Sequence, residues 1–169
     1  CGGSSRSGTT ASASTTATPT TLPDIAPTAA DFLNINTMTH VGDRVVGSLN
    51  GHLAEAVAVA RSAKGGVFPV GTVIQLVPIE AMVKRYKGFS PRTRDWEFFT
   101  LSVSADGTRI HESGTTDIRN VAGNCASCHA AARPEFDFVC EQGHGCDPIP
   151  VTRAMFGALQ RTDPRCKGS

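Results

Sequence analysis

Hydrophobic and polar residues alternate with different periods along this chain, and the periods predict its elements. An amphipathic helix is predicted between Asn50, a candidate cap, and the pair Gly65 and Gly66, which would end it. Its apolar residues recur three or four positions apart, at Leu53, Ala56, Val57 and Ala60. A second helix is predicted over 152–161, with Asp163-Pro164 ending it. Its expected apolar stripe is Met155, Phe156 and Leu159.

Between these helices, branched and aromatic residues predict β-strands. The predicted strands cover 71–77, 81–86 and 96–103. Asp106-Gly107 is a strong hairpin signal, so a partner strand is expected from Thr108 through His111. The fold class predicted is α+β, an antiparallel sheet with flanking helices.

The first 30 residues have a different character from the rest. Of these, 25 are Ser, Thr, Ala, Gly or Pro, a composition that cannot build a core. We therefore expect a flexible tether over 1–30 and a folded domain over 31–169. The chain starts with Cys1-Gly2-Gly3, which resembles mature exported lipoproteins, whose first cysteine carries acyl chains. Acylated Cys1 would anchor the protein to a membrane on the periplasmic or cell-surface side.

Composition narrows the function classes. Hydrophobic residues make up 40% of the 169 residues, charged residues 18%, and the formal net charge is +1. No apolar run approaches the roughly 20 residues that cross a bilayer. Because no basic stripe is present, nucleic-acid binding is disfavoured.

The most specific signal is Cys125-Ala126-Ser127-Cys128-His129. Two cysteines separated by two residues and followed at once by histidine mark covalent attachment of c-type haem. The two thiols can bond the two vinyl groups of the porphyrin, while His129 can bind the iron from one face. One covalent haem c is therefore expected, with Cys125, Cys128 and His129 as its attachment residues.

Two other chemistries use the same cysteine spacing. A four-cysteine zinc site needs a second such pair, which the sequence lacks. A thioredoxin-like dithiol opens a helix after a strand in a parallel unit, whereas this motif follows an antiparallel region. Both alternatives fit less well than haem.

The order of motifs resembles the cytochrome P460 family and its relative cytochrome c'-beta. The resemblance covers roughly residues 50 to 140, and its motifs are Phe68 to Val73, Ala81 to Lys84, Asp95 to Phe99 and Asn124 to Ala131. It implies an exported, mostly β body with a single haem c near the C-terminal end of the sheet. Members either oxidise hydroxylamine and nitric oxide or bind diatomic gases.

In the oxidising members a lysine is cross-linked to the haem edge, and a distal carboxylate transfers protons. The strand after Gly71-Thr72 has no lysine at the expected place, so Lys84 on the next strand is the remaining candidate. Candidate carboxylates are Glu80, Glu97 and Glu112.

The function depends on the second face of the iron. A second protein ligand gives a low-spin electron carrier, and an open position gives a site for small molecules. Candidate ligands, each of which could instead serve packing or solvation, are Met38, Met82, Met155, His40, His52 and His111. An apolar distal pocket could be formed by Phe89, Phe98 and Phe99, and packing alone would also explain them.

Three further cysteines need explanation. Cys140 and Cys146 bracket a glycine-rich loop, and Cys166 lies near the end of the chain. An exported setting favours a disulfide, either Cys140–Cys146 or one of these to Cys166. A small metal site of Cys140, His144 and Cys146 is the alternative.

The leading hypothesis is an exported, lipid-anchored monohaem cytochrome c that carries single electrons between redox partner proteins, alone or within a larger membrane-associated assembly. The second hypothesis is a P460-like enzyme or gas binder acting on nitric oxide or hydroxylamine. A third is a lipoprotein whose haem only stabilises its body.

Overall fold

The computed structural model describes residues 25–165, so Cys1 and Cys166 lie outside the described residues. Six antiparallel strands form the main sheet, and their order in the sheet is their order along the chain. They are β1 (Thr39–Val41), β2 (Arg44–Ser48), β3 (Thr72–Gln75), β4 (Glu80–Lys84), β5 (Trp96–Ser104) and β6 (Gly107–Gly114). The prediction of an α+β fold around an antiparallel sheet is confirmed.

Within residues 25–165, three α-helices accompany this sheet: α1 (Leu53–Arg61), α2 (Cys125–His129) and α3 (Arg153–Arg161). Short 3-10 helices cover Ala29–Asp31, Ile35–Thr37, Pro91–Thr93 and Pro134–Phe136. A separate two-stranded hairpin pairs β7 (Arg119–Asn120) with β8 (Gly123–Asn124) and leads directly into α2.

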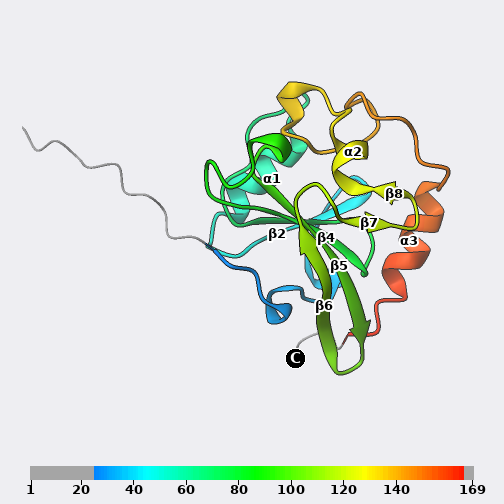
Figure 1. Cartoon of the computed structure of the whole chain (residues 1–169). Coiled ribbons are helices and arrows are strands. Elements are labelled where there is room, and N and C mark those ends of the chain that lie inside the picture. Colours follow the sequence, from blue (N-terminus) through cyan, green and yellow to red (C-terminus); the bar gives the residue numbers. More distant parts are fainter. Residues whose placement is uncertain (1–24, 166–169) are drawn as a thin grey trace, which may run out of the picture.

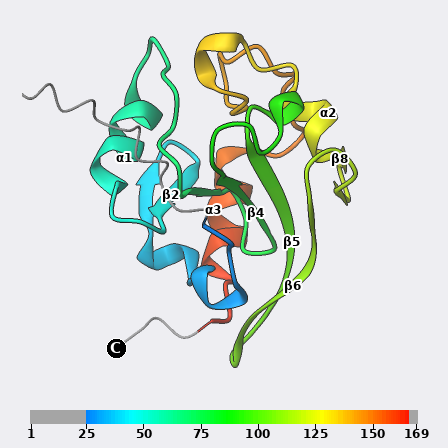
Figure 2. The same cartoon turned by 60° about the vertical axis from the view of Figure 1, so that its left-hand side comes forward.

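Successive side chains of a strand point to opposite faces of the sheet. In the main sheet, residues on both faces are buried in a hydrophobic cluster. One face packs against α1, α2 and the segment after α2; its core includes Met82, Trp96, Phe98 and Phe138. The other face packs against the N-terminal segment and includes Phe32, Val83 and Phe99. In Figures 1 and 2, α2 and the loops after it lie at one end of the sheet, opposite the tip of the β5–β6 hairpin.

The three predicted central strands and the hairpin are confirmed, although β3 and β4 are shorter than expected. The prediction that Asn50 caps α1 is wrong. Its side chain accepts a hydrogen bond from Ser48 Oγ and donates another to the Val70 carbonyl, so His52 takes the cap position. The helix ends at Arg61, before Gly65 and Gly66.

The last helix begins where the sequence predicts, because the Thr152 hydroxyl accepts a hydrogen bond from the Met155 N–H at 3.3 Å. Its predicted apolar stripe is only partly buried. Phe156 is in the core, but Met155 and Leu159 are 52% and 45% exposed. The other buried residue of α3 is Gln160, whose amide donates to the carbonyls of Asp43 and Leu76.

The described structure starts inside the segment that composition predicts as a tether. Residues 25–30 include the beginning of the Ala29–Asp31 helix, and they precede a stretch that the chain's C-terminal part holds in place. Asp163 accepts a hydrogen bond from the Ile35 N–H at 2.9 Å, and Arg165 donates to the Phe32 carbonyl at 2.7 Å. Within residues 25–165, no helix is both long and apolar enough to cross a bilayer.

Candidate functional site

The Cys125–His129 motif forms a short helix whose start is fixed by its own neighbours. The Asn124 side chain accepts a hydrogen bond from the Ser127 N–H at 2.8 Å, which satisfies one of the free donors of the first turn. The same side chain donates to the Thr116 carbonyl at 2.8 Å, and the Cys125 N–H donates to the Ile118 carbonyl at 3.0 Å. These hydrogen bonds attach the motif to the segment that precedes β7, without help from a cofactor.

Both cysteines of the motif are free thiols, with Cys125 half-buried and Cys128 exposed. Burial, followed by the nearby charge of Glu80, raises the pKa of the Cys125 thiol to about 11. A dithiol oxidoreductase needs a thiolate of lowered pKa at this position. The environment of Cys125 thus disfavours thioredoxin-like chemistry, whereas reduced, accessible thiols suit thioether formation.

The His129 ring is oriented by the protein. Its Nδ1 lies 2.8 Å from the Phe138 carbonyl oxygen, which can only accept, so Nδ1 carries the proton and Nε2 keeps its lone pair. The ring lies edge to face with Phe98 at a centroid distance of 5.2 Å and is stacked with Phe138 at 6.3 Å. Burial lowers the pKa of His129, which keeps the imidazole neutral. A neutral imidazole with a bonded Nδ1–H is the form in which histidine binds a metal.

The carbonyl that orients His129 belongs to an unusual turn. Asp137 and Phe138 have φ values of 51° and 70°, a left-handed conformation that costs of order 1–3 kcal/mol at each non-glycine residue. Contacts from distant segments hold this turn. Trp96 Nε1 donates to the Asp137 carbonyl at 2.6 Å, and the His144 Nδ1–H donates to the Val139 carbonyl at 2.7 Å.

The carboxylate of Asp137 is buried and accepts three hydrogen bonds. It accepts hydrogen bonds at 2.8 Å from Lys84 Nζ, at both oxygens, and from the Phe68 N–H. Lys84 Nζ also donates to the Arg94 carbonyl at 2.6 Å and lies 5.2 Å from the centroid of the Trp96 ring. Burial lowers the pKa of Lys84 and raises that of Asp137, and each charge partly offsets the shift of the other.

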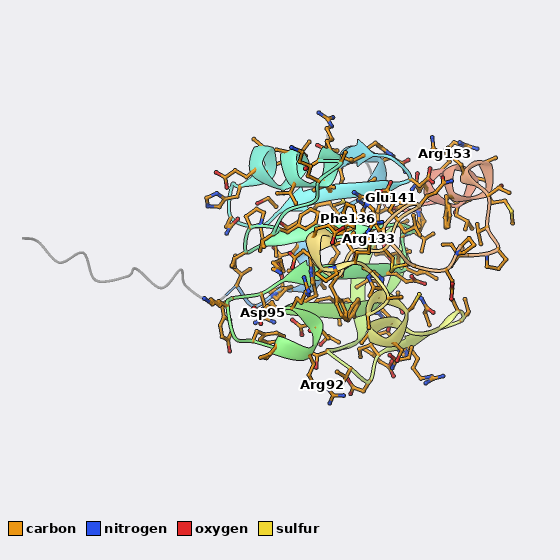
Figure 3. The ribbon with its side chains drawn as sticks, turned by 90° about the horizontal axis from the view of Figure 1, so that it is seen from above. Arg92, Asp95, Arg133, Phe136, Glu141 and Arg153 are labelled. Atoms are coloured by element: carbon orange, nitrogen blue, oxygen red, sulfur yellow. A yellow bond between two sulfur atoms is a disulfide. The ribbon has the colours of Figure 1, made fainter. Side chains whose placement is uncertain are left out.

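A disulfide closes the loop beside this turn. Cys140 and Cys146 are bonded, with their Cα atoms 5.7 Å apart, which confirms the first of the expected pairings. His144 in the loop stacks on Phe136 at 3.7 Å, and Glu141 forms an ion pair with the buried Arg44. Figure 3 shows Glu141, Phe136 and Arg133 close together at this end of the molecule. The loop thus supports the turn through His144, which contacts both Phe136 and the Val139 carbonyl.

The alternative metal site at this loop does not form. Both of its thiols are in the disulfide, and His144 uses Nδ1 on the Val139 carbonyl. Among residues 25–165, no three His, Cys, Asp or Glu side chains are grouped to hold a metal ion.

Replacing Cys140 and Cys146 together by serine is expected to lower the free energy of unfolding by about 2 kcal/mol, because the short loop gains freedom mainly in the unfolded chain. Urea denaturation followed by circular dichroism measures the change. A reducing agent should lower the stability of the unmodified protein to the same level and leave the double variant unaffected. Equal urea midpoints for all samples would show that the disulfide contributes nothing.

The candidate second ligands of the iron differ in their surroundings. Met82 is buried in the core cluster that contains Phe98 and also Ala126, a residue of the motif. The other five are not in this cluster: Met38 packs on the opposite face of the sheet, His52 pairs with Glu55, and His40, His111 and Met155 are exposed. Met82 is therefore the one candidate that shares a core cluster with the motif.

The three candidate carboxylates are separated as well. Glu80 lies near Cys125 on the same face of β4 as Met82 and Lys84, and burial raises its pKa. Glu97 pairs with Arg85 on the other face of the sheet, and Glu112 is exposed on β6. Only Glu80 is brought to the motif.

The candidate pocket residues also divide. Phe98 contacts His129, Phe99 packs with Phe32 on the opposite face at 5.0 Å, and Phe89 packs with Tyr86 at 5.6 Å. The three phenylalanines therefore do not form one pocket.

Sequence reasoning missed Asp137, although a charged residue inside the apolar run Phe136 to Val139 is a signal of a buried, partnered carboxylate.

Comparisons with protein-family models, with curated proteins and with solved structures found no match.

Proposed function

We propose that this chain is an exported monohaem c-type cytochrome that carries single electrons. The observation that carries the proposal is the His129 geometry: its Nδ1–H is held by the Phe138 carbonyl, and its Nε2 keeps a lone pair for a metal, in the same short helix as two free thiols. This is the donor set that covalent haem requires, a pair of reduced cysteines followed by an oriented imidazole. The residues present therefore fit the group that the motif implies.

In this proposal each residue of the motif has a separate task. The Cys125 and Cys128 thiols would hold the porphyrin through one thioether each, to its two vinyl groups. His129 Nε2 would be the ligand of the iron, and the Phe138 carbonyl fixes the tautomer. When bound, the haem supplies an iron that changes between the ferrous and ferric states. Because Cys128 is exposed, the sulfur it contributes lies where a partner protein can approach.

The cellular setting belongs to the same proposal. A P460-like body, acylation of Cys1 and a tether over the first residues would place the cytochrome at a membrane, within reach of donor and acceptor proteins. Residues 1–24, including Cys1, lie outside the described structure. Support for this part comes from the sequence alone.

A second candidate function is the binding or oxidation of nitric oxide or hydroxylamine at an open iron position. Two observations favour it. Five of the six candidate second ligands lie outside the core cluster that contains Ala126 of the motif, and Glu80, a carboxyl group whose pKa burial raises, lies near Cys125. A carboxyl group with a raised pKa holds its proton more firmly than an ordinary carboxyl group, which suits a group that transfers protons.

Optical spectra of the reduced protein separate the two functions. An electron carrier is expected to be low-spin and to ignore carbon monoxide and nitric oxide. If Met82 is the second ligand, Met82→Leu should convert the iron to a high-spin form, while Met155→Leu, an exposed control, should change nothing. A high-spin native protein that binds either gas readily would instead establish the second function.

A further inference from the structure

We propose that the buried Lys84–Asp137 ion pair positions His129. This inference rests on the proposed haem site. The ion pair fixes the turn that presents the Phe138 carbonyl, and through that carbonyl it sets how strongly the imidazole would donate to iron. Lys84 and Asp137 are positioning residues in this account, because neither touches the iron or the porphyrin. The role differs from the haem cross-link that the sequence resemblance implies for a lysine.

The ion pair connects the turn to the central strands of the sheet. Lys84 ends β4 and pairs in register with Trp96 at the start of β5. These two neighbours both bind Asp137: Lys84 Nζ binds its carboxylate at 2.8 Å, and Trp96 Nε1 binds its carbonyl oxygen at 2.6 Å. Side chain and backbone of Asp137 are thus both tied to the central strands, one residue before the carbonyl that His129 uses.

The ammonium group of Lys84 has no donor left for other chemistry. An ammonium has three hydrogens, and three acceptors surround this one: the two Asp137 oxygens and the Arg94 carbonyl. Its side chain is only 7% exposed. Lys84 is therefore committed to the turn and is not available to react with a haem edge.

The turn needs such support because its backbone is strained. Two consecutive non-glycine residues in the left-handed region relax unless their surroundings hold them. If Asp137 is released, the Phe138 carbonyl can move away from His129 Nδ1. A weaker hydrogen bond at Nδ1 makes the imidazole less basic and a poorer donor to ferric iron. The midpoint potential of the iron should then rise.

The test measures the midpoint potentials of the mature protein, of Asp137→Asn, of Lys84→Met and of the double variant. Positioning predicts an upward shift in all three variants, with the double variant shifted no more than the single ones, because all remove the same support. Charge alone predicts opposite signs, since loss of an anion raises the potential and loss of a cation lowers it. Asparagine also keeps an acceptor for the Phe68 N–H and tolerates a positive φ.

A second readout is the pH at which His129 leaves the iron on acidification, followed in the absorption spectrum. It should move to higher pH in each variant. Glu97→Gln is the matched control, because Glu97 forms a buried ion pair with Arg85 on the opposite face of the same strands. It is expected to lower stability without changing either readout.

The outcomes distinguish this inference from the proposed function. Mass spectrometry of each sample first establishes that haem is attached. A native protein without haem would overturn the proposed function, and the positioning role with it. Attached haem with shifts of opposite sign for Lys84→Met and Asp137→Asn, or with the same shift in Glu97→Gln, would overturn the positioning role alone.

Discussion

Replacing Cys125 and Cys128 together by alanine is expected to abolish covalent haem completely. Each thioether needs one of these sulfurs, and the Cys140 and Cys146 sulfurs are bonded to each other. After expression with the haem maturation machinery, acid and organic solvent should extract all porphyrin from the double variant and none from the unmodified protein. Gel staining for haem and the mass of the denatured chain both report the result.

The matched control removes the same number of sulfurs elsewhere. Cys140→Ser/Cys146→Ser should retain its haem, because these residues stabilise the neighbouring loop and take no part in attachment. Single Cys125→Ala and Cys128→Ala variants should each keep one thioether at lower yield. Haem that resists extraction in the Cys125→Ala/Cys128→Ala protein would place the attachment elsewhere.

Lys84→Met is expected to lower the free energy of unfolding by about 3–5 kcal/mol, the second largest effect that the structure predicts. The methionine leaves the Asp137 carboxylate without its cation at a place where that side chain is 4% exposed. Removing one member of a buried pair is costly because the remaining charge has lost its water and its partner. Urea unfolding at neutral pH, followed by circular dichroism, measures the change.

The double variant Lys84→Met/Asp137→Asn should recover part of this loss, since it buries no unpaired charge. The stability of the Lys84→Met single variant should also depend on pH. Burial already raises the pKa of Asp137, and loss of Lys84 raises it further, so the single variant should become less stable as the pH rises above the ordinary aspartate range. A Lys84→Met protein within about 1 kcal/mol of the unmodified one would show that the pair contributes little.

The central sheet could be predicted because its strands have a simple pattern and short connections. The first two strands were missed, although they are joined by Gly42-Asp43, a two-residue turn in which Gly42 has a φ of 63°. These strands are too short to show a clear alternation of apolar and polar residues, since β1 has three residues and β2 has five. Turn chemistry is thus a better signal than apolar alternation for such short strands.

The last helix shows where periodicity misleads. Sequence reasoning placed its boundaries within one residue but assigned Met155 and Leu159 to the buried face. In the structure Gln160 is buried instead, and its amide donates to the backbone carbonyls of Asp43 and Leu76. A polar residue with such distant partners cannot be recognised from local hydrophobicity.

The candidate site also combines residues that a local sequence pattern predicts with contacts that form only between distant segments. The attachment residues form one pentapeptide, so their spacing is readable directly. The groups that orient His129 are a backbone carbonyl nine residues later and an ion pair between residues 53 positions apart. Nothing in the local pattern connects them, because backbone carbonyls carry no sequence signal and the pair depends on the folded sheet.

The most direct test is the mass of the native protein, purified from cells that attach c-type haem and measured under denaturing conditions. The peptide containing Cys125 and Cys128 is expected to carry the mass of one haem and to absorb light as a haem does. A colourless peptide with the mass of its amino acids alone would contradict the proposed function.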